Sequence, residues 1–143
     1  MGTVNYWEAA LRHYHDGMAL LAAQPTPRDA NADQLFGLAA ECALKAVLVW
    51  VGVPTDADGG VRDRGLREHI DALWPEYVNH PDGRVAARYQ IASSNPFQDW
   101  SIHRRYVADA HAGGGAAATH ERAAFACLLV AQKALADHLG SLP

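Results

Sequence analysis

The stretch Leu38-Ala-Ala-Glu-Cys-Ala-Leu-Lys-Ala-Val-Leu48 decides how this chain folds. It belongs to a longer segment, Asn31 to Gly52, in which apolar side chains occupy nearly every position around the helical turn. A helix without a polar face must be covered on most sides, so we expect this one at the centre of a bundle. Asn31 is the predicted N-cap, and Gly52 followed by Pro54 predicts the end of the helix.

Amphipathic segments flank this central helix in the sequence. Apolar residues recur at spacings of three and four from Asn5 to Ala23 and from Thr119 to Leu139, which is helical periodicity. Shorter segments with the same spacing lie at 66–77 and 85–92. No stretch alternates polar and apolar residues as a strand does. The sequence therefore predicts one all-α domain over residues 1–143, an up-and-down bundle of four to five helices.

The composition is that of a globular domain, with 143 residues of which 50% are hydrophobic and 20% charged. A formal charge of −4 argues against nonspecific coating of a polyanion and leaves room only for a local basic site. No signal-peptide pattern opens the chain, and Glu41 and Lys45 interrupt its most apolar stretch, 35–51. Cys42 and Cys127 both lie in apolar helical stretches, as reduced core thiols do. We therefore expect a cytoplasmic protein without a membrane span.

Glu41 and Lys45 stand one helical turn apart inside the apolar stretch, in the orientation that favours an ion pair. One interpretation is that they pair with each other at a seam of the bundle. A second interpretation is that Glu41 holds an arginine from another segment, since a buried carboxylate needs a charged or hydrogen-bonding partner. Arg104 and Arg105 are the candidates for that partner.

The densest polar cluster runs from Trp100 to His111, in a stretch that is either helical or irregular. Arginine braces a phosphate through its planar fork, and histidine moves protons near neutral pH. This pairing suits RNA cleavage without a metal, with Arg105 on the phosphorane and His111 activating the 2′-hydroxyl or protonating the leaving oxygen. The alternative is structural: Arg105 and Asp109 form an ordinary helical ion pair, and Tyr106 packs inward.

Around this pair we expect His103, Arg104 and Tyr106 to contribute to substrate binding. Among the histidines, His103, His111 and His120 are nearest to one another in sequence. A metal-binding bundle would need at least three of the histidines and carboxylates to converge. The sequence has no HExxH motif, and the Glu-x-x-His spacing of di-iron bundles is absent at Glu41. We therefore predict neither a metal nor another cofactor.

The central stretch resembles the "AAE-x-A-x-KA-x-L" helix of HEPN domains, with Glu41 and Lys45 at its polar positions. Arg105 and Tyr106, followed by Asp109 and a final amphipathic helix, are similar to the "RYPD" segment that precedes the last helix in many members. The family signature is an arginine, a polar residue, and a histidine after four to six intervening positions. Arg105 and His111 enclose five residues, and Tyr106 stands where the family usually has Asn, Asp or His.

The resemblance implies a helical bundle that commonly dimerises and is associated with RNA or nucleotide binding. Many members are metal-independent ribonucleases, often toxins or defence effectors paired with a nucleotidyltransferase-like antitoxin. The rival interpretation is a non-catalytic member that dimerises or caps a partner protein such as a nucleotidyltransferase. The first interpretation requires Arg105 and His111, whereas the second tolerates substitution at His111.

Overall fold

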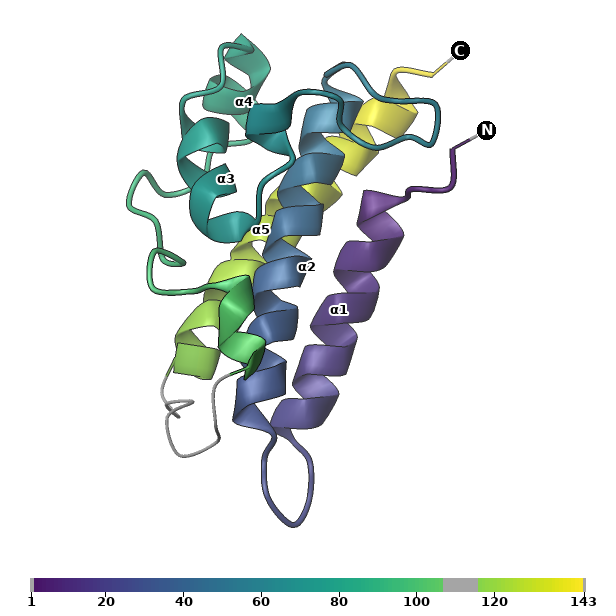
Figure 1. Cartoon of the computed structure of the whole chain (residues 1–143). Coiled ribbons are helices and arrows are strands. Elements are labelled where there is room, and N and C mark those ends of the chain that lie inside the picture. The colour runs from purple at the N-terminus through teal and green to yellow at the C-terminus, as the bar shows by residue number, and fades with distance from the viewer. Residues whose placement is uncertain (1, 107–115, 143) are drawn as a thin grey trace.

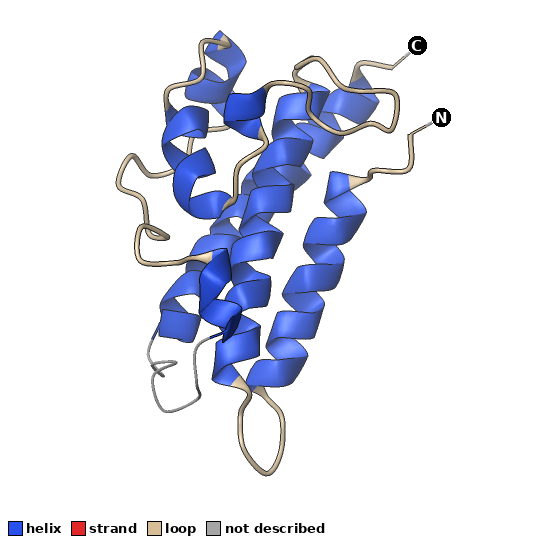
Figure 2. Cartoon of the chain, viewed as in Figure 1, coloured by secondary structure: helices blue, strands red, loops and turns tan. Residues whose placement is uncertain are grey.

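The computed structural model describes residues 2–106 and 116–142. Within these ranges every regular secondary-structure element is a helix (Figure 2). A single bridge between Thr55 and Val61 is the only extended pairing in the same ranges. The elements, with η marking short 3-10 helices, are α1 (Tyr6–Leu21), α2 (Asp29–Trp50), η1 (Arg64–Leu66), α3 (Ile70–Val78), α4 (Gly83–Arg88), η2 (Ile102–Tyr106) and α5 (Ala116–Gly140). The predicted all-α bundle is confirmed.

Helix α2 lies at the centre of the bundle, with α1 and α5 packed along it (Figure 1). Phe36, Leu44 and Val47 retain no exposed surface. Full burial of such a side chain stabilises the fold by about 1.5–3 kcal/mol. This burial explains why the sequence of α2 lacks a polar face, as predicted.

The three long helices do not alternate strictly in direction. Helix α1 runs antiparallel to α2, whereas α5 runs parallel to it (Figure 1). Asp33 near the start of α2 contacts His120 near the start of α5. At the other end of the two helices, Trp50 of α2 stacks on His138 of α5 with ring centroids 6.1 Å apart. The up-and-down order therefore holds for α1 and α2, and the chain between α2 and α5 crosses back along the bundle.

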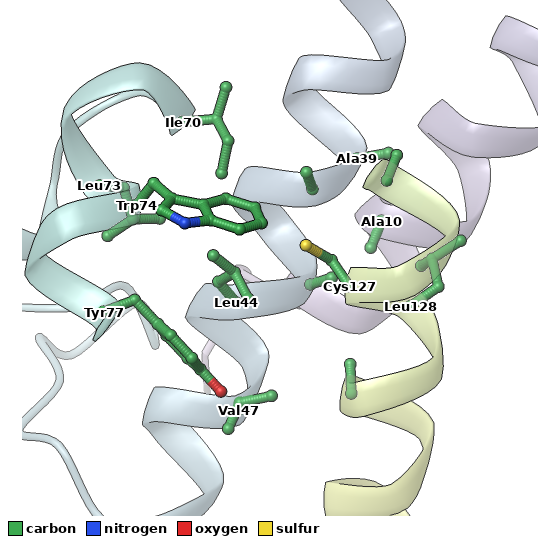
Figure 3. Close-up of a cluster of buried hydrophobic side chains, with 14 of the residues drawn as sticks. Ala10, Ala39, Leu44, Val47, Ile70, Leu73, Trp74, Tyr77, Cys127 and Leu128 are labelled. Carbon is green, nitrogen blue, oxygen red and sulfur yellow. The ribbon is translucent and has the colours of Figure 1, made fainter. Parts of the chain in front are cut away.

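Helix α3 covers a further side of α2. Figure 3 shows Trp74 and Tyr77 of α3 directed towards α2, with Cys127 entering from α5. Both aromatic side chains also satisfy their polar atoms, since Trp74 Nε1 donates to the carbonyl of Ala92 at 2.8 Å and the Tyr77 hydroxyl donates to the carbonyl of Tyr89 at 2.6 Å. Neither of these two buried side chains therefore leaves its donor unpaired.

Several helix ends differ from the predicted ones. Helix α2 begins at Asp29 with Arg28 at its N-cap, so Asn31 lies inside the first turn. Leu66 belongs to η1 rather than to the third helix, which continues through Pro75. The start of α1 agrees closely with the sequence, because the Asn5 side chain accepts a hydrogen bond from the Glu8 amide at 3.0 Å.

Gly37 of α2 makes room for the indole ring of Trp100. A Cβ atom at position 37 would lie 2.1 Å from Cε2 of Trp100, well inside van der Waals contact. Trp100 is 1% exposed and immediately precedes the segment that leads into η2. The missing side chain at position 37 therefore determines where that segment meets the bundle.

We predict that Gly37→Ala lowers the free energy of unfolding, measured by urea denaturation, by about 2 kcal/mol. Overpacking against Trp100 costs about 1–3 kcal/mol and outweighs the gain of about 1 kcal/mol in helix propensity. Gly83→Ala is the matched control, because no atom lies within 4 Å of a Cβ at that position. Equal stability of the two variants would contradict the assigned role of Gly37.

Candidate functional site

The arginines that the sequence analysis singles out lie in η2, which packs against α2 (Figure 1). We call His103 to Tyr106 the cationic segment. Gln34 of α2 donates from Nε2 to the carbonyl of Ser101 at 2.9 Å, and Ile102 packs against the core. These contacts attach the chain to the bundle just before its charged residues. The buried Oε1 of Gln34 has no hydrogen-bond partner within the described ranges.

Arg105 and Tyr106 project into solvent as a pair. Tyr106 keeps 72% of its surface exposed, so the alternative in which it packs inward is wrong. The Arg105 guanidinium lies 4.7 Å from the centroid of the Tyr106 ring, and its Nη2 donates to the Tyr106 hydroxyl at 2.8 Å. A guanidinium beside an exposed aromatic ring can bind a phosphate while the ring stacks on a base.

Other predicted site residues have different surroundings. His103 is exposed next to this pair, and Arg104 is half-buried. Asp109 and His111 lie outside the described residues. The Arg105–His111 pair and the Arg105–Asp109 pair therefore both stay predictions.

The carboxylate of Glu41 is buried in α2 between two partners. Its Oε2 accepts from Lys45 Nζ at 2.9 Å, so the predicted pair is present. Its Oε1 lies 3.0 Å from Nδ1 of His69, the residue just before α3. The second partner is thus His69 and not Arg104 or Arg105, because α3 begins against the middle of α2.

His13 of α1 lies near the same carboxylate. Burial lowers the pKa of His13, the charge of Arg12 lowers it further, and the charges of Asp16 and Glu41 only partly oppose these effects. The neutral imidazole is therefore favoured at this position. We call Glu41, Lys45, His69 and His13 the Glu41 cluster.

Trp100 connects the Glu41 cluster to the N-terminal part of α2. Its ring centroid lies 6.4 Å from that of His69, and its Nε1 donates to the carbonyl of Asp33 at 3.0 Å. Asp33, Gly37 and Glu41 follow one another at four-residue spacing, so they form one stripe of the helix. The polar contacts of the site therefore line up along α2.

Another histidine, His120, lies among carboxylates at the start of this stripe. Nδ1 of His120 bonds to Oδ1 of Asp33, and its Nε2 lies 3.1 Å from Oδ1 of Asp99. Its ring stacks on Phe97 with centroids 4.9 Å apart, and the residue is 2% exposed. This network joins α2, α5 and the chain before η2.

The ionisation of His120 follows from two opposing effects. Burial lowers its pKa, but the hydrogen bonds and charges of Asp33 and then Asp99 together outweigh burial and raise the pKa above its usual value. A histidine with carboxylates at both ring nitrogens is most stable as the imidazolium, because both nitrogens then donate. The network therefore consists of salt bridges that join α5 to α2 and to the chain before η2.

Sequence reasoning gave His120 no role beyond the metal alternative, and it assigned neither Asp33 nor Asp99 to the site. The position of Asp33 on the stripe of Gly37 and Glu41 is the one local signal that could have drawn attention to it. Over residues 2–106 and 116–142, no three histidine, cysteine, aspartate or glutamate side chains are placed to hold a metal ion.

None of the helices described is long and apolar enough to cross a membrane. Comparison of the chain with protein-family models, with curated proteins and with solved structures finds no match. Function must therefore be inferred from the residues of the site.

We predict that Asp33→Ala lowers the free energy of unfolding by about 3 kcal/mol, because it leaves a buried imidazolium without its main partner. Asp99→Ala is the matched control: its side chain is 73% exposed, so its loss should cost less than about 1 kcal/mol. Urea denaturation of both variants measures the difference.

The loss in Asp33→Ala should also depend on pH. Because the pKa of His120 is raised, its salt bridges contribute fully to the free energy of unfolding below the unfolded-state pKa of about 6.5. This contribution decreases as pH rises through the folded-state pKa. The gap between wild type and Asp33→Ala should therefore be larger near pH 6 than near pH 9. A gap that grows with pH would contradict a charged His120.

Proposed function

We propose that this chain is a HEPN-like protein that binds RNA through the cationic segment and cleaves it without a metal ion. The observation that carries the proposal is the exposed pair of Arg105 and Tyr106. Single-stranded RNA is recognised by cations that contact phosphates together with aromatic rings on which bases stack. This pair offers both groups at one place.

The charge distribution supports a local site. The whole chain carries a formal charge of −4, so its surface as a whole does not attract a polyanion. His103, Arg104 and Arg105 are consecutive, and contacts of the preceding residues attach them to α2. Binding is therefore proposed to depend on a few contacts at one segment.

Cleavage is proposed from the spacing of Arg105 and His111. Attack of a 2′-hydroxyl on the adjacent phosphorus places extra negative charge on the phosphoryl oxygens, which a guanidinium stabilises. A histidine can accept or donate a proton in the same step. These groups need no metal ion, so activity should persist in EDTA.

We predict that Arg105→Ala and Tyr106→Ala each weaken binding of a single-stranded RNA oligonucleotide by about tenfold, measured by fluorescence anisotropy in EDTA. The losses correspond to one phosphate contact and to one stacking contact of about 1–3 kcal/mol. Arg64→Ala, which removes an exposed arginine from η1, should bind as wild type does. If Arg64→Ala weakens binding as much as Arg105→Ala does, the contribution of Arg105 is one of net charge and not of a local site.

Cleavage is assayed on the same oligonucleotide in EDTA, with wild type compared with Arg105→Ala and His111→Ala. We expect wild type to produce 2′,3′-cyclic phosphate ends and both variants to lose at least about 100-fold in rate. Cleavage that persists in both variants, or that wild type never shows, would remove the ribonuclease part of the proposal.

A second candidate function is that of a helical adaptor that dimerises or binds a partner such as a nucleotidyltransferase. One observation favours it: Phe125 and Leu129, one turn apart on α5, are about half-exposed although they are large and apolar. Ala126 lies beside them and is also exposed. A second copy of the chain could cover this face in a symmetric dimer.

If this face forms a dimer, wild type should have twice the monomer mass in size-exclusion chromatography with light scattering. Leu129→Glu should then be monomeric, because it places a charge in an apolar interface. Ala87→Glu adds the same charge at an exposed position of α4 and should remain dimeric. A monomeric wild type would exclude the dimer.

A further inference from the structure

Two histidine–carboxylate pairs lie along α2, one on each side of Trp100. His120 pairs with Asp33 and His69 pairs with Glu41, while Trp100 contacts both the carbonyl of Asp33 and the ring of His69. A carboxylate that holds one ring nitrogen of a histidine fixes its tautomer and orientation, as in hydrolytic triads. The surroundings of the second nitrogen decide whether such a pair can act on a ligand.

His120 has no nitrogen left for a ligand. Asp33 and Asp99 occupy Nδ1 and Nε2, and only 2% of the residue is exposed. Proton exchange with a bound molecule would require the network to open. The pair of His120 and Asp33 therefore has a structural role and does not act on a ligand.

His69 has the opposite arrangement. Its Nδ1 lies against Glu41, whereas Nε2 has no hydrogen-bond partner anywhere in the described part of the chain. The side chain is 47% exposed, and it does not cap α3 although it occupies the N-cap position. With Nδ1 donating to Glu41, Nε2 carries the lone pair and can accept a proton from a ligand.

Glu41 is fixed firmly enough to orient that ring. Lys45 holds its other oxygen at 2.9 Å, and both side chains are about nine-tenths buried. The Lys45 ammonium also lies 6.0 Å from the ring centroid of Tyr6, on α1. A carboxylate with one oxygen on a buried cation has little freedom to turn away from its second partner.

The cationic segment begins close to His69 in space. Trp100, whose ring meets that of His69, stands two residues before the start of η2. For an RNA strand held by Arg105 and Tyr106 to react at His69, its 2′-hydroxyl must lie beside the His69 ring. Transfer of a phosphoryl group from the 5′-oxygen to the 2′-oxygen requires one group that accepts a proton and one that supplies one.

Building on the RNA cleavage proposed above, we infer that Nε2 of His69 is the proton acceptor, with Glu41 as its positioning residue. The 2′-oxygen forms a bond to phosphorus as His69 takes its proton, and the bond from phosphorus to the 5′-oxygen breaks. The leaving 5′-oxygen takes its proton from an acid, the role that remains for His111 in the cleavage proposed above. The products are a 2′,3′-cyclic phosphate and a 5′-hydroxyl, with no oxidant or metal consumed.

The tautomer of His69 is measured first, by long-range proton–nitrogen correlation NMR on the full chain near pH 8. We expect Nδ1 to carry the proton in wild type, and uridine 3′-monophosphate to shift the Nε2 signal. Glu41→Gln removes the carboxylate but keeps its shape, so the Nδ1–H form should lose its dominance. A wild-type His69 protonated at Nε2, or one that the nucleotide leaves unshifted, would overturn the inference.

Cleavage by His69→Gln in EDTA is the second measurement. We expect the rate to fall at least about 100-fold while anisotropy shows unchanged RNA affinity. His15→Asn, which changes an exposed histidine of α1, should cleave as wild type does. Circular dichroism confirms that the variants fold, and the half-exposed position of His69 makes its replacement mild.

The outcomes separate this inference from the proposed function. If wild type cleaves RNA and His69→Gln cleaves equally well, His69 is not the acceptor although the ribonuclease remains. If wild type binds RNA without cleaving it, the ribonuclease and the role of His69 both fail. If wild type does not bind RNA at all, the function assigned to the cationic segment fails as well.

Discussion

The burial of α2 on nearly every side is the constraint on which the rest of the structure depends. A buried helix that also carries Asp33, Gln34, Glu41 and Lys45 must find partners for them within the protein. Lys45 pairs with Glu41 inside the helix, but the other partners come from α5, from the chain before η2 and from the residue before α3. The polar residues of α2 thus determine how the remaining segments pack around it.

The same constraint explains why one helix contributes to both the core and the candidate site. Apolar positions of α2 meet α1, α3 and α5, while the stripe of Asp33, Gly37 and Glu41 receives two histidines and one tryptophan. Gly37 lets Trp100 approach the helix between the two carboxylates. The cationic segment is held at the surface because residues just before it are held in this stripe.

The helices were predictable from sequence because helical periodicity and the apolar run of α2 are local signals. The pair of Glu41 with Lys45 was predictable for the same reason, since both lie on one helix. His69 was not, because it stands in a short connection where no periodicity indicates which element it faces. His120 and Asp33 are 87 positions apart, so only the packing of α5 parallel to α2 shows that they meet.

The parallel arrangement of α2 and α5 has a consequence for the order in which the chain can fold. Helices α1 and α2 are neighbours in sequence, so their packing closes only a short loop. The contact between Asp33 and His120 closes a far longer one, and loop closure costs more entropy as the loop lengthens. We therefore expect the α1–α2 hairpin to form first and α5 to dock after it. The cationic segment lies within that long loop, so we expect it to reach its final position late in folding.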